Sequence, residues 1–386
     1  MPTFADLLSP VDPDQFLATA WQRAPFVISR RVRDHYAGLF DRHAFSRLLT
    51  YGEMSRRDAR AIRSGAVDPE QVIFDARGVA DPLAMMNAYA EGYSLVLNNL
   101  QEHDRRVAEL CRGLEVTFRH PVGANAYLTP CGAQGLNAHY DDHDVFVLQI
   151  DGSKVWRLHP PVVELPLRGE YVDVDEASLG PPQETVELDS GDLMYLPRGT
   201  IHQAVATTES SLHLTLGMSS NRWADVLARA ATRFAAVEPT WRRALDLSPA
   251  DAHAPTDAVD MHWPPIERLR GLVPEVLTQL EIEFIETLRP LEDGGFDHLD
   301  ACRDLTLMSQ VRHRLGTICR ADSDERSARI RFPGGTVVCP PAAAGALEFI
   351  AQHEEFAVGD LPDLLEDSAK LNVVRKLVVA GMLIPC

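Results

Sequence analysis

Basic residues, and lysine in particular, are scarce in this chain of 386 residues. Of its 37 Lys and Arg only three are lysines (Lys154, Lys370 and Lys376), and its 56 Asp and Glu give a net charge of −19. A surface of this sign repels nucleic acid, which disfavours DNA or RNA as the main partner, although a local basic patch is compatible with the average. We therefore expect a protein or peptide partner and no direct contact with nucleic acid.

Paired cysteines and long apolar runs are also missing. The six cysteines are scattered without a Cys-x-x-Cys pair, so neither a zinc module nor a disulfide framework is indicated. No apolar run approaches the roughly 18 residues of a membrane span. Residues 1–8 lack the basic region and long apolar core of a signal peptide. We expect no membrane association and a location in the reducing cytoplasm.

Short strand patterns fill the middle of the chain. An apolar share of 45% with 24% charged residues is ordinary for a globular protein, and the length suffices for two or three domains. A helix is predicted to start at Asp12-Pro13, and an amphipathic helix is predicted over 102–114. The strand patterns are separated by Gly, Pro and Asp turns and cover 93–98, 124–129, 144–150, 154–158, 185–188, 193–196 and 212–216. They predict a sandwich or small barrel whose mouth can hold a site.

The pattern becomes helical after Gly217. A first helix is predicted from Trp223 to Val237, and a Pro- and Asp-rich stretch over 246–265 separates it from a second helix over 266–288. Such helices usually pack on their own domain, and an interface between copies is the alternative. Strand patterns at 330–332 and 336–338 and three helical patterns then suggest a winged helix. Because residues 341–386 hold seven acidic and three basic residues, a packing or partner-binding module is preferred to a DNA reader.

Two histidines and an aspartate form the most informative pattern. His139 and Asp141 are two residues apart, so on a strand they point to the same face, and a His from another strand completes a metal-binding set. The spacing of Gly191, Pro197, Gly199 and His202 reproduces the second sequence signature of the cupin barrel. In that signature the Pro and Gly form a tight turn that directs the His into the barrel mouth. Three such ligands leave three open positions on an octahedral ion, enough for a bidentate co-substrate and dioxygen. The pattern predicts a non-haem Fe(II) oxygenase site.

Lys154 is the best candidate for a cation inside the barrel. An oxygenase of this kind uses 2-oxoglutarate, whose distal carboxylate needs a positive charge. The strand parity of Lys154 allows an inward orientation, while a surface position is its simplest alternative and Arg157 and Arg198 are other candidate cations. Asn125 and Tyr127 share one face of their strand, where they could bind co-substrate or peptide or be polar residues satisfied within the core.

The residues around Asp141 have weaker claims on the metal. His143 has the same strand parity as His139 and Asp141 and is an alternative ligand, but a metal at the barrel mouth would have to reach along the strand to it. Asp142 and Asp144 should face the other way, in a supporting role or toward solvent.

Together these residues resemble the ribosomal oxygenases of the JmjC and cupin-like family, which are 2-oxoglutarate-dependent protein hydroxylases. The resemblance extends to 221–223 and 356–383 and is carried mainly by 125–130, 134–135, 139–149, Gly152, 154–156, 197–203 and 212–216. It implies His139, Asp141 and His202 as the catalytic iron ligands and Lys154 as the partner of the distal carboxylate. The cofactor-binding candidates that accompany Lys154 are Asn125, Tyr127 and Thr215.

The same resemblance implies the organisation of the chain and its activity. We expect a mixed α and β chain with an N-terminal α/β segment packing on the barrel (1–90). From about residue 90 the resemblance implies a double-stranded β-helix of the JmjC/cupin type (91–218), a helical dimerisation region (219–298) and a winged-helix domain (299–386). The expected protein is a homodimer that hydroxylates a His or Arg side chain of a ribosomal protein. The alternatives are hydroxylation of a natural-product peptide, or a metal-dependent cupin enzyme or sensor without 2-oxoglutarate. Family members carry Ser directly after the 212–216 strand, where this chain has Gly217, which implies the loss of one hydrogen bond to co-substrate or substrate.

Overall fold

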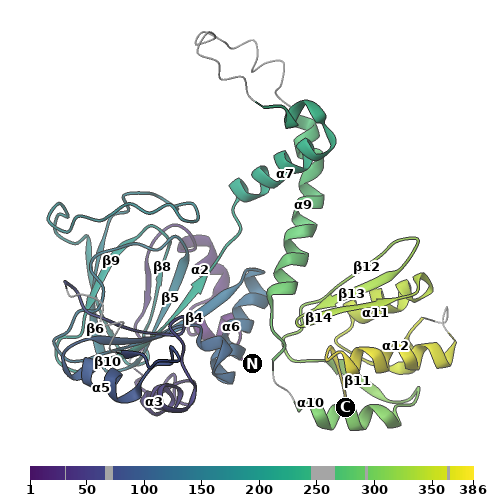
Figure 1. Cartoon of the computed structure of the whole chain (residues 1–386), viewed down its shortest axis with the longest axis horizontal. Helices are drawn as coiled ribbons and strands as arrows, with labels where there is room; N and C mark the ends of the chain where they lie inside the picture. Colours follow the sequence, from purple (N-terminus) through teal and green to yellow (C-terminus); the bar gives the residue numbers. More distant parts are fainter. Residues whose placement is uncertain (31, 66–72, 245–265, 292–293, 363–365) are drawn as a thin grey trace. The chain divides into compact units, whose positions relative to one another are not determined.

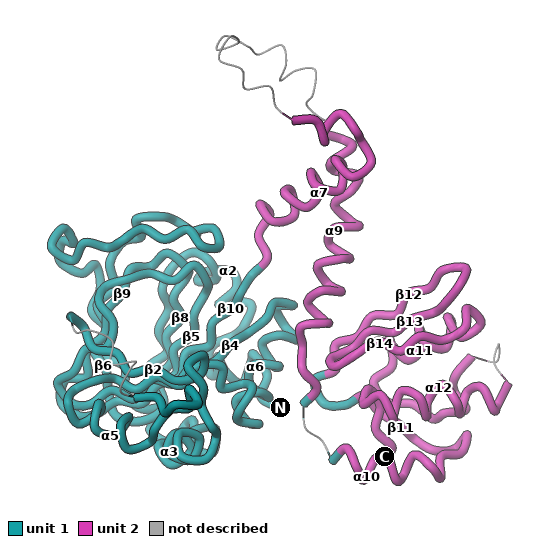
Figure 2. Tube along the Cα trace, in the orientation of Figure 1, with its two compact units in different colours: residues 1–220, 291–294, 314–316 teal, residues 221–290, 295–313, 317–386 magenta. Residues whose placement is uncertain are grey.

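The computed structural model describes residues 1–30, 32–65, 73–244, 266–291, 294–362 and 366–386. They form two compact units, drawn in different colours in Figure 2. The first unit comprises residues 1–220, 291–294 and 314–316, and the second comprises 221–290, 295–313 and 317–386. None of the described helices is long and apolar enough to span a membrane.

Two antiparallel sheets form the barrel of the first unit (Figure 1). The larger sheet has the order β1-β8-β5-β10-β4-β3-β2, with β1 Phe26–Ile28, β2 Ala59–Ile62, β3 Ser94–Leu97, β4 Val122–Thr129, β5 Asp144–Asp151, β8 Leu193–Leu196 and β10 Ser211–Met218. The smaller sheet has the order β7-β6-β9, with β6 Ser153–His159, β7 Glu184–Asp189 and β9 Ile201–Val205. This arrangement confirms the predicted mixed fold with a cupin-like barrel.

Alternation along β5 separates the core of the barrel from the core beneath the helices. Val145 and Val147 pack with Trp156 of the smaller sheet, whereas Phe146 and Leu148 belong to the larger cluster on the other face. Both faces of β5 are covered, so seven of its eight residues are buried and five of the eight are apolar. The other elements of this unit are α1 Phe4–Leu8, α2 Pro13–Thr19, α3 Arg42–Tyr51, α5 Pro82–Ala90, the 3₁₀ turn η1 Leu100–Glu102 and α6 Arg105–Phe118.

The N-terminal helices hold the back of the larger sheet through aromatic contacts. Asp12 caps α2 by accepting from the backbone N–H groups of Asp14 and Gln15, as the sequence predicted. The helix places the Phe16 ring against Tyr195 of β8 with the ring centroids 5.0 Å apart, edge to face. This packing fixes β8, which leads directly into the Pro197–His202 turn.

The second unit begins with two helices and continues into small sheets. Val226 and Ala230 of α7 pack on Val276 and Leu280 of α9. The sheets have the orders β15-β11-β16 and β12-β13-β14. The helical elements are α7 Trp223–Val237, η2 Pro239–Arg242, α9 Ile266–Thr287, α10 Gly295–Ala301, η4 Cys302–Asp304, η5 Pro341–Ala343, α11 Ala344–Gln352, η6 Val358–Asp360 and α12 Asp367–Val379. The strands are β11 Gln310–His313, β12 Arg320–Ser323, β13 Ala328–Phe332, β14 Gly335–Cys339, β15 Glu355–Ala357 and β16 Leu383–Pro385.

All seven strand patterns predicted from 93 to 216 are confirmed, as are the helices after Trp223 and Ile266. β1, β2 and β9 were not predicted, and the separating stretch 246–265 lies outside the described residues. The sequence also placed His139 and Asp141 on a strand, which is wrong. They lie in an extended segment before β5 that pairs only through an isolated bridge between His139 and His202.

Candidate active site

A cavity of about 360 Å³ opens between the two sheets of the barrel. Its volume lies at the lower end of the range, roughly 300–1,000 Å³, that suits small-molecule ligands. The sequence-predicted residues that line it are His139, Asp141, His202, Lys154, Asn125, Tyr127 and Thr215, and His143 lines it as well. The fold therefore brings together seven candidates that span 91 positions of the chain between Asn125 and Thr215.

His139, Asp141 and His202 form a cluster with metal-ligand geometry. One ligand atom from each of the three lies within 4.8 Å of the others, and this is the one such group among the described residues. The His202 Nε2 atom is 3.8 Å from Asp141 Oδ2, and the centroids of the two imidazole rings are 4.4 Å apart. A divalent ion between these atoms would hold two nitrogens and one oxygen on a single side.

Backbone carbonyls orient both imidazoles for metal binding. Nδ1 of His139 lies 2.8 Å from the Asn137 carbonyl oxygen, and Nδ1 of His202 lies 3.0 Å from that of Thr200. Because a carbonyl oxygen only accepts, each Nδ1 carries the proton and each Nε2 presents its lone pair. Burial, and next the neighbouring His139, lower the pKa of His202, which favours the neutral form that a metal needs.

The turn before His202 is tied to the segment that carries Asp141. The backbone N–H of Gly199 donates to the carbonyl oxygen of Asp141 at 2.9 Å, and His139 and His202 exchange two backbone hydrogen bonds of 3.1 and 2.8 Å. Gly199 has φ +89°, and a Cβ there would lie 2.4 Å from the Val163 carbonyl oxygen. Only glycine fits this turn without strain, so the signature residue is required by both conformation and space.

Lys154 is buried deep in the cavity without a carboxylate partner. Its side chain is 5% exposed, and Nζ donates to Thr129 Oγ1 at 3.2 Å and lies 5.8 Å from the centre of the Trp156 ring. Within the described part of the chain no acidic group forms a salt bridge with it. Burial lowers the pKa of Lys154 to about 7. An ammonium group in this position is stabilised when a carboxylate enters the cavity.

Asn125, Tyr127 and Thr215 lie on adjacent strands of one cavity wall. Thr215 of β10 is directly paired with Asn125 of β4, and Asn125 Oδ1 accepts from the backbone N–H of Asn99 at 3.2 Å. Tyr127 stacks on His213 with the ring centroids 4.9 Å apart. Burial, and next Asp141, raise the pKa of the Tyr127 hydroxyl, which stays protonated and able to donate.

The alternative cations and carboxylates lie elsewhere. Arg157 is exposed, and Arg198 donates to Asp144 at 3.1 Å, so neither is available to a ligand in the cavity. Asp144 is completely buried and also accepts from the Tyr195 hydroxyl at 2.8 Å, which corrects the solvent alternative. Asp142 accepts from the backbone N–H of Gly169 at 2.7 Å. Neither aspartate belongs to the metal-binding cluster.

Sequence reasoning missed His213 and Thr129. His213 is 2% exposed, and its Nδ1 has no hydrogen-bond partner among the described residues. Burial, and next the charge of Lys154, lower its pKa. Strand parity could have found both, because His213 precedes Thr215 by two residues and Thr129 follows Tyr127 by two.

Comparison with protein families identifies the class of domain. Residues 96–226 match the model of the JmjC domain. This match covers the metal-binding cluster, Lys154 and the cavity wall, so the barrel of the first unit is a JmjC domain.

Individual relatives are similar to this chain over somewhat more than half of its length. The chain is 34% identical over 233 residues to the bifunctional lysine-specific demethylase and histidyl-hydroxylase NO66 of Dictyostelium discoideum, covering 59% of this chain and 45% of the relative. It is 34% identical over 238 residues to ribosomal oxygenase 2 of Mus musculus, covering 60% and 50%. The chain spans about half the length of these curated relatives. The JmjC match and these relatives confirm the resemblance to ribosomal oxygenases that was found in the sequence.

Solved structures extend the likeness of the fold to nearly the whole chain. The X-ray structure of E. coli ycfD matches with a TM-score of 0.57 at 17% identity, covering 97% of this chain and 98% of that one. A structure of YcfD as a ribosomal oxygenase in complex with cobalt and 2-oxoglutarate matches with a TM-score of 0.56 over the same shares. At this identity the match shows a common fold.

Proposed function

We propose that this protein is an Fe(II)- and 2-oxoglutarate-dependent oxygenase that hydroxylates a side chain of a protein. The proposal depends on one observation: a single cavity is lined both by the cluster of His139, Asp141 and His202 and by Lys154. Lys154 is buried there and forms no salt bridge with a carboxylate of the described residues. The names of the relatives support it, because they include ribosomal oxygenases and a histidyl-hydroxylase.

The donor set fits iron. His139, Asp141 and His202 would hold Fe(II) through two imidazole Nε2 atoms and one carboxylate oxygen, a set that leaves positions open for co-substrate and dioxygen. When bound, the iron would supply the oxidative chemistry that converts 2-oxoglutarate and dioxygen into succinate and carbon dioxide and places one oxygen on a substrate C–H. The protein contributes ligand orientation through the Asn137 and Thr200 carbonyls, which keep Nε2 unprotonated.

The cavity also fits 2-oxoglutarate. Lys154 would bind the distal carboxylate, and the hydroxyl of Thr129 already holds the ammonium group in place. Asn125, Tyr127 and Thr215 offer hydrogen bonds along one wall to co-substrate or substrate. A cupin enzyme that uses no 2-oxoglutarate would have no need of a buried, unpaired lysine, which is why we place this alternative second.

As substrate we propose a His or Arg side chain of a ribosomal protein. Ribosomal proteins are largely basic, and the net charge of −19 favours a basic partner. The similarity to ribosomal oxygenases supports the same choice. Hydroxylation of a peptide in a natural-product pathway would use the same site and remains the alternative outcome of the substrate search.

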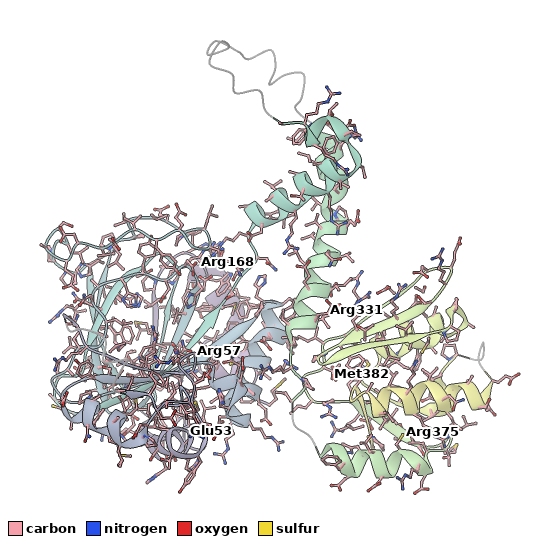
Figure 3. The ribbon with its side chains drawn as sticks, in the orientation of Figure 1. Glu53, Arg57, Arg168, Arg331, Arg375 and Met382 are labelled. Atoms are coloured by element: carbon pink, nitrogen blue, oxygen red, sulfur yellow. The ribbon has the colours of Figure 1, made fainter. Side chains whose placement is uncertain are left out.

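For the remaining segments we propose the division at 90, 218 and 298, with a homodimer formed through 219–298. The exposed Trp223 and Leu227 of α7 and Leu277 of α9 give these helices an apolar surface that a second copy would cover. For 299–386 we propose a winged-helix module that does not read DNA. Figure 3 shows Arg331 and Arg375 among its side chains. Arg331 pairs with Asp322 and Arg375 donates to the Leu305 carbonyl, so both cations are engaged within the module.

We place the protein in the cytoplasm, where all six cysteines would stay as the free thiols found here. A reducing compartment would also keep the iron ferrous.

The test combines turnover with a search for the substrate. Purified protein loaded with Fe(II) is incubated with 2-oxoglutarate and the host's ribosomal proteins, and succinate and a mass gain of one oxygen are measured together. We expect both with the wild-type protein and neither with His139→Ala. Equal turnover in the two proteins would overturn the ligand assignment, and absence of N-oxalylglycine binding to the metal-loaded protein would favour the cupin alternative.

A further inference from the structure

His143 lies over a place where the barrel wall carries almost no side chain. Gly217 of β10 pairs with Gly123 of β4 on one side and with Val145 of β5 on the other, so two of the three residues in this row are glycines. A Cβ on Gly217 would lie 2.7 Å from Cδ2 and 2.8 Å from Nε2 of His143. Gly217 is within a regular strand, and what it provides is therefore the space that the imidazole occupies.

The Nδ1 side of the His143 ring, opposite the edge that faces Gly217, contacts a carboxylate. Its Nδ1 lies 3.4 Å from Asp142 Oδ1, and the other oxygen of Asp142 accepts from the backbone N–H of Gly169 at 2.7 Å. The carboxylate is thus anchored to the loop between β6 and β7, and it draws the Nδ1 edge of the imidazole toward itself. The opposite edge, with Cδ2 and Nε2, faces Gly217.

This position gives the cavity a hydrogen-bond acceptor beside the metal-binding cluster. With the Nδ1 proton directed at Asp142, Nε2 presents a lone pair. The side chain of His143 is 36% exposed and lines the same cavity as Asp141 and Asn125. His143 is outside the metal-binding cluster, and the exposed part of its ring faces the space that a substrate would enter.

We propose that His143, seated over Gly217, selects the side chain that is hydroxylated, and that it selects one with an N–H donor, namely an imidazole, a guanidinium or a carboxamide. The inference rests on the proposed function and adds a specificity determinant to it. An aliphatic side chain in the same place would leave Nε2 of His143 without a partner, and a site built for hydrogen bonds rejects ligands that lack them.

Three variants and a matched control separate this role from a structural one. His143→Phe keeps a ring of similar size and removes the acceptor, whereas His143→Gln restores an acceptor oxygen. Gly217→Ala places a methyl group where the imidazole lies and displaces it. Gly123→Ala is the control, because it adds the same methyl group in the same row, where the nearest atom is the Gln101 amide nitrogen at 3.9 Å.

The assay uses a peptide library made by digesting a cell lysate with a Glu-specific protease. Each metal-loaded protein is incubated with the library and 2-oxoglutarate, and mass spectrometry locates every added oxygen. Succinate formed without peptide and the Kd of N-oxalylglycine are measured in parallel. We expect the wild type to place oxygen on His, Arg, Asn or Gln, and His143→Phe and Gly217→Ala to raise the KM of the modified peptides by about tenfold or more. The Kd of N-oxalylglycine should change by less than about twofold, His143→Gln should recover part of the loss, and Gly123→Ala should match the wild type.

The remaining outcomes have separate meanings. Oxygen on aliphatic residues, unchanged KM in His143→Phe, or equal effects of the two glycine variants would overturn the role of His143. Succinate formation without any modified peptide would overturn the substrate class while leaving the oxygenase in place. Failure of the wild type both to form succinate and to bind N-oxalylglycine would instead reject the proposed function.

Discussion

The ammonium group of Lys154 donates to the hydroxyl of Thr129 at 3.2 Å, and that hydroxyl also accepts from Ser94 at 2.9 Å. A neutral hydroxyl group is thus the hydrogen-bonding neighbour of the buried ammonium group. It orients the ammonium group without neutralising it, so the protonated form remains available to a ligand.

Lys154→Met should weaken 2-oxoglutarate binding and stabilise the ligand-free protein. Loss of a charged hydrogen bond should raise the Kd by roughly tenfold to a hundredfold. The free energy of unfolding without ligand should rise by about 1–4 kcal/mol, because an apolar chain of similar length replaces a buried charge. Calorimetric titration and urea unfolding measure the two effects. Arg157→Met, which removes an exposed cation from the same strand, should change neither, and a loss of both affinity and stability in Lys154→Met would contradict this account.

The affinity for 2-oxoglutarate should fall as the pH rises above about 7. Burial lowers the pKa of Lys154 to about 7 in the free protein, and a bound carboxylate raises that pKa again. Below pH 7 the free lysine is already protonated, whereas above it binding must take up a proton. Calorimetry in buffers of different ionisation enthalpy should show nearly no proton uptake at pH 6 and close to one proton at pH 8. Absence of uptake at pH 8 would place the distal carboxylate elsewhere.

Asp141→Asn should abolish the stabilisation of the protein by a divalent metal. A metal at a hundredfold excess over its Kd stabilises the wild type by about 2.7 kcal/mol, and removal by a chelator should reverse this. Thermal unfolding with and without Mn²⁺ measures the difference. Asp142→Asn is the adjacent control, since Asp142 lies outside the metal-binding cluster. A metal-induced shift that survives in Asp141→Asn would exclude this carboxylate as a ligand.

Asp144→Asn should destabilise the barrel by about 3 kcal/mol, because it leaves the buried Arg198 without its counter-ion. The same substitution at Asp175, in the loop between β6 and β7, should change the free energy of unfolding by less than about 0.5 kcal/mol. Urea unfolding compares the two variants. Equal stabilities would mean that the hydrogen bonds of Asp144 to Tyr195 and Arg198 contribute little.

Local patterns in the sequence were sufficient for most of the strands. β4, β5 and β10 are bounded by turn residues and rich in apolar side chains, so each is recognisable without its neighbours. β9 was missed because Ile201–Val205 begins at the end of the signature turn and is defined by its pairing with β6, in which His202 lies opposite Leu158. Pairing between distant segments is not visible in a local window.

The residues of the candidate site could be predicted where strand alternation or the cupin sequence signature applied. The grouping of His139, Asp141 and His202 and the burial of Lys154 follow the sequence argument, although the segment with His139 is held by one bridge and not by a full ladder. The seat of His143 over Gly217 could not be predicted, because it depends on how the segment before β5 folds back across β10. From the sequence, Gly217 could be identified only as a position where the serine hydroxyl of related proteins is lost. In the structure, the imidazole of His143 occupies the space that a side chain at position 217 would fill.

The backbone hydrogen bond from Gly199 to Asp141 joins residues that are 58 positions apart in the sequence, and His139 and His202 are separated by even more residues. Neither segment can form the three-ligand cluster by itself. A growing or partly folded chain should therefore bind iron only weakly until the two sheets have closed into the barrel. Iron loading should therefore follow folding in time, and a chain trapped before closure would be an oxygenase that never acquires its metal.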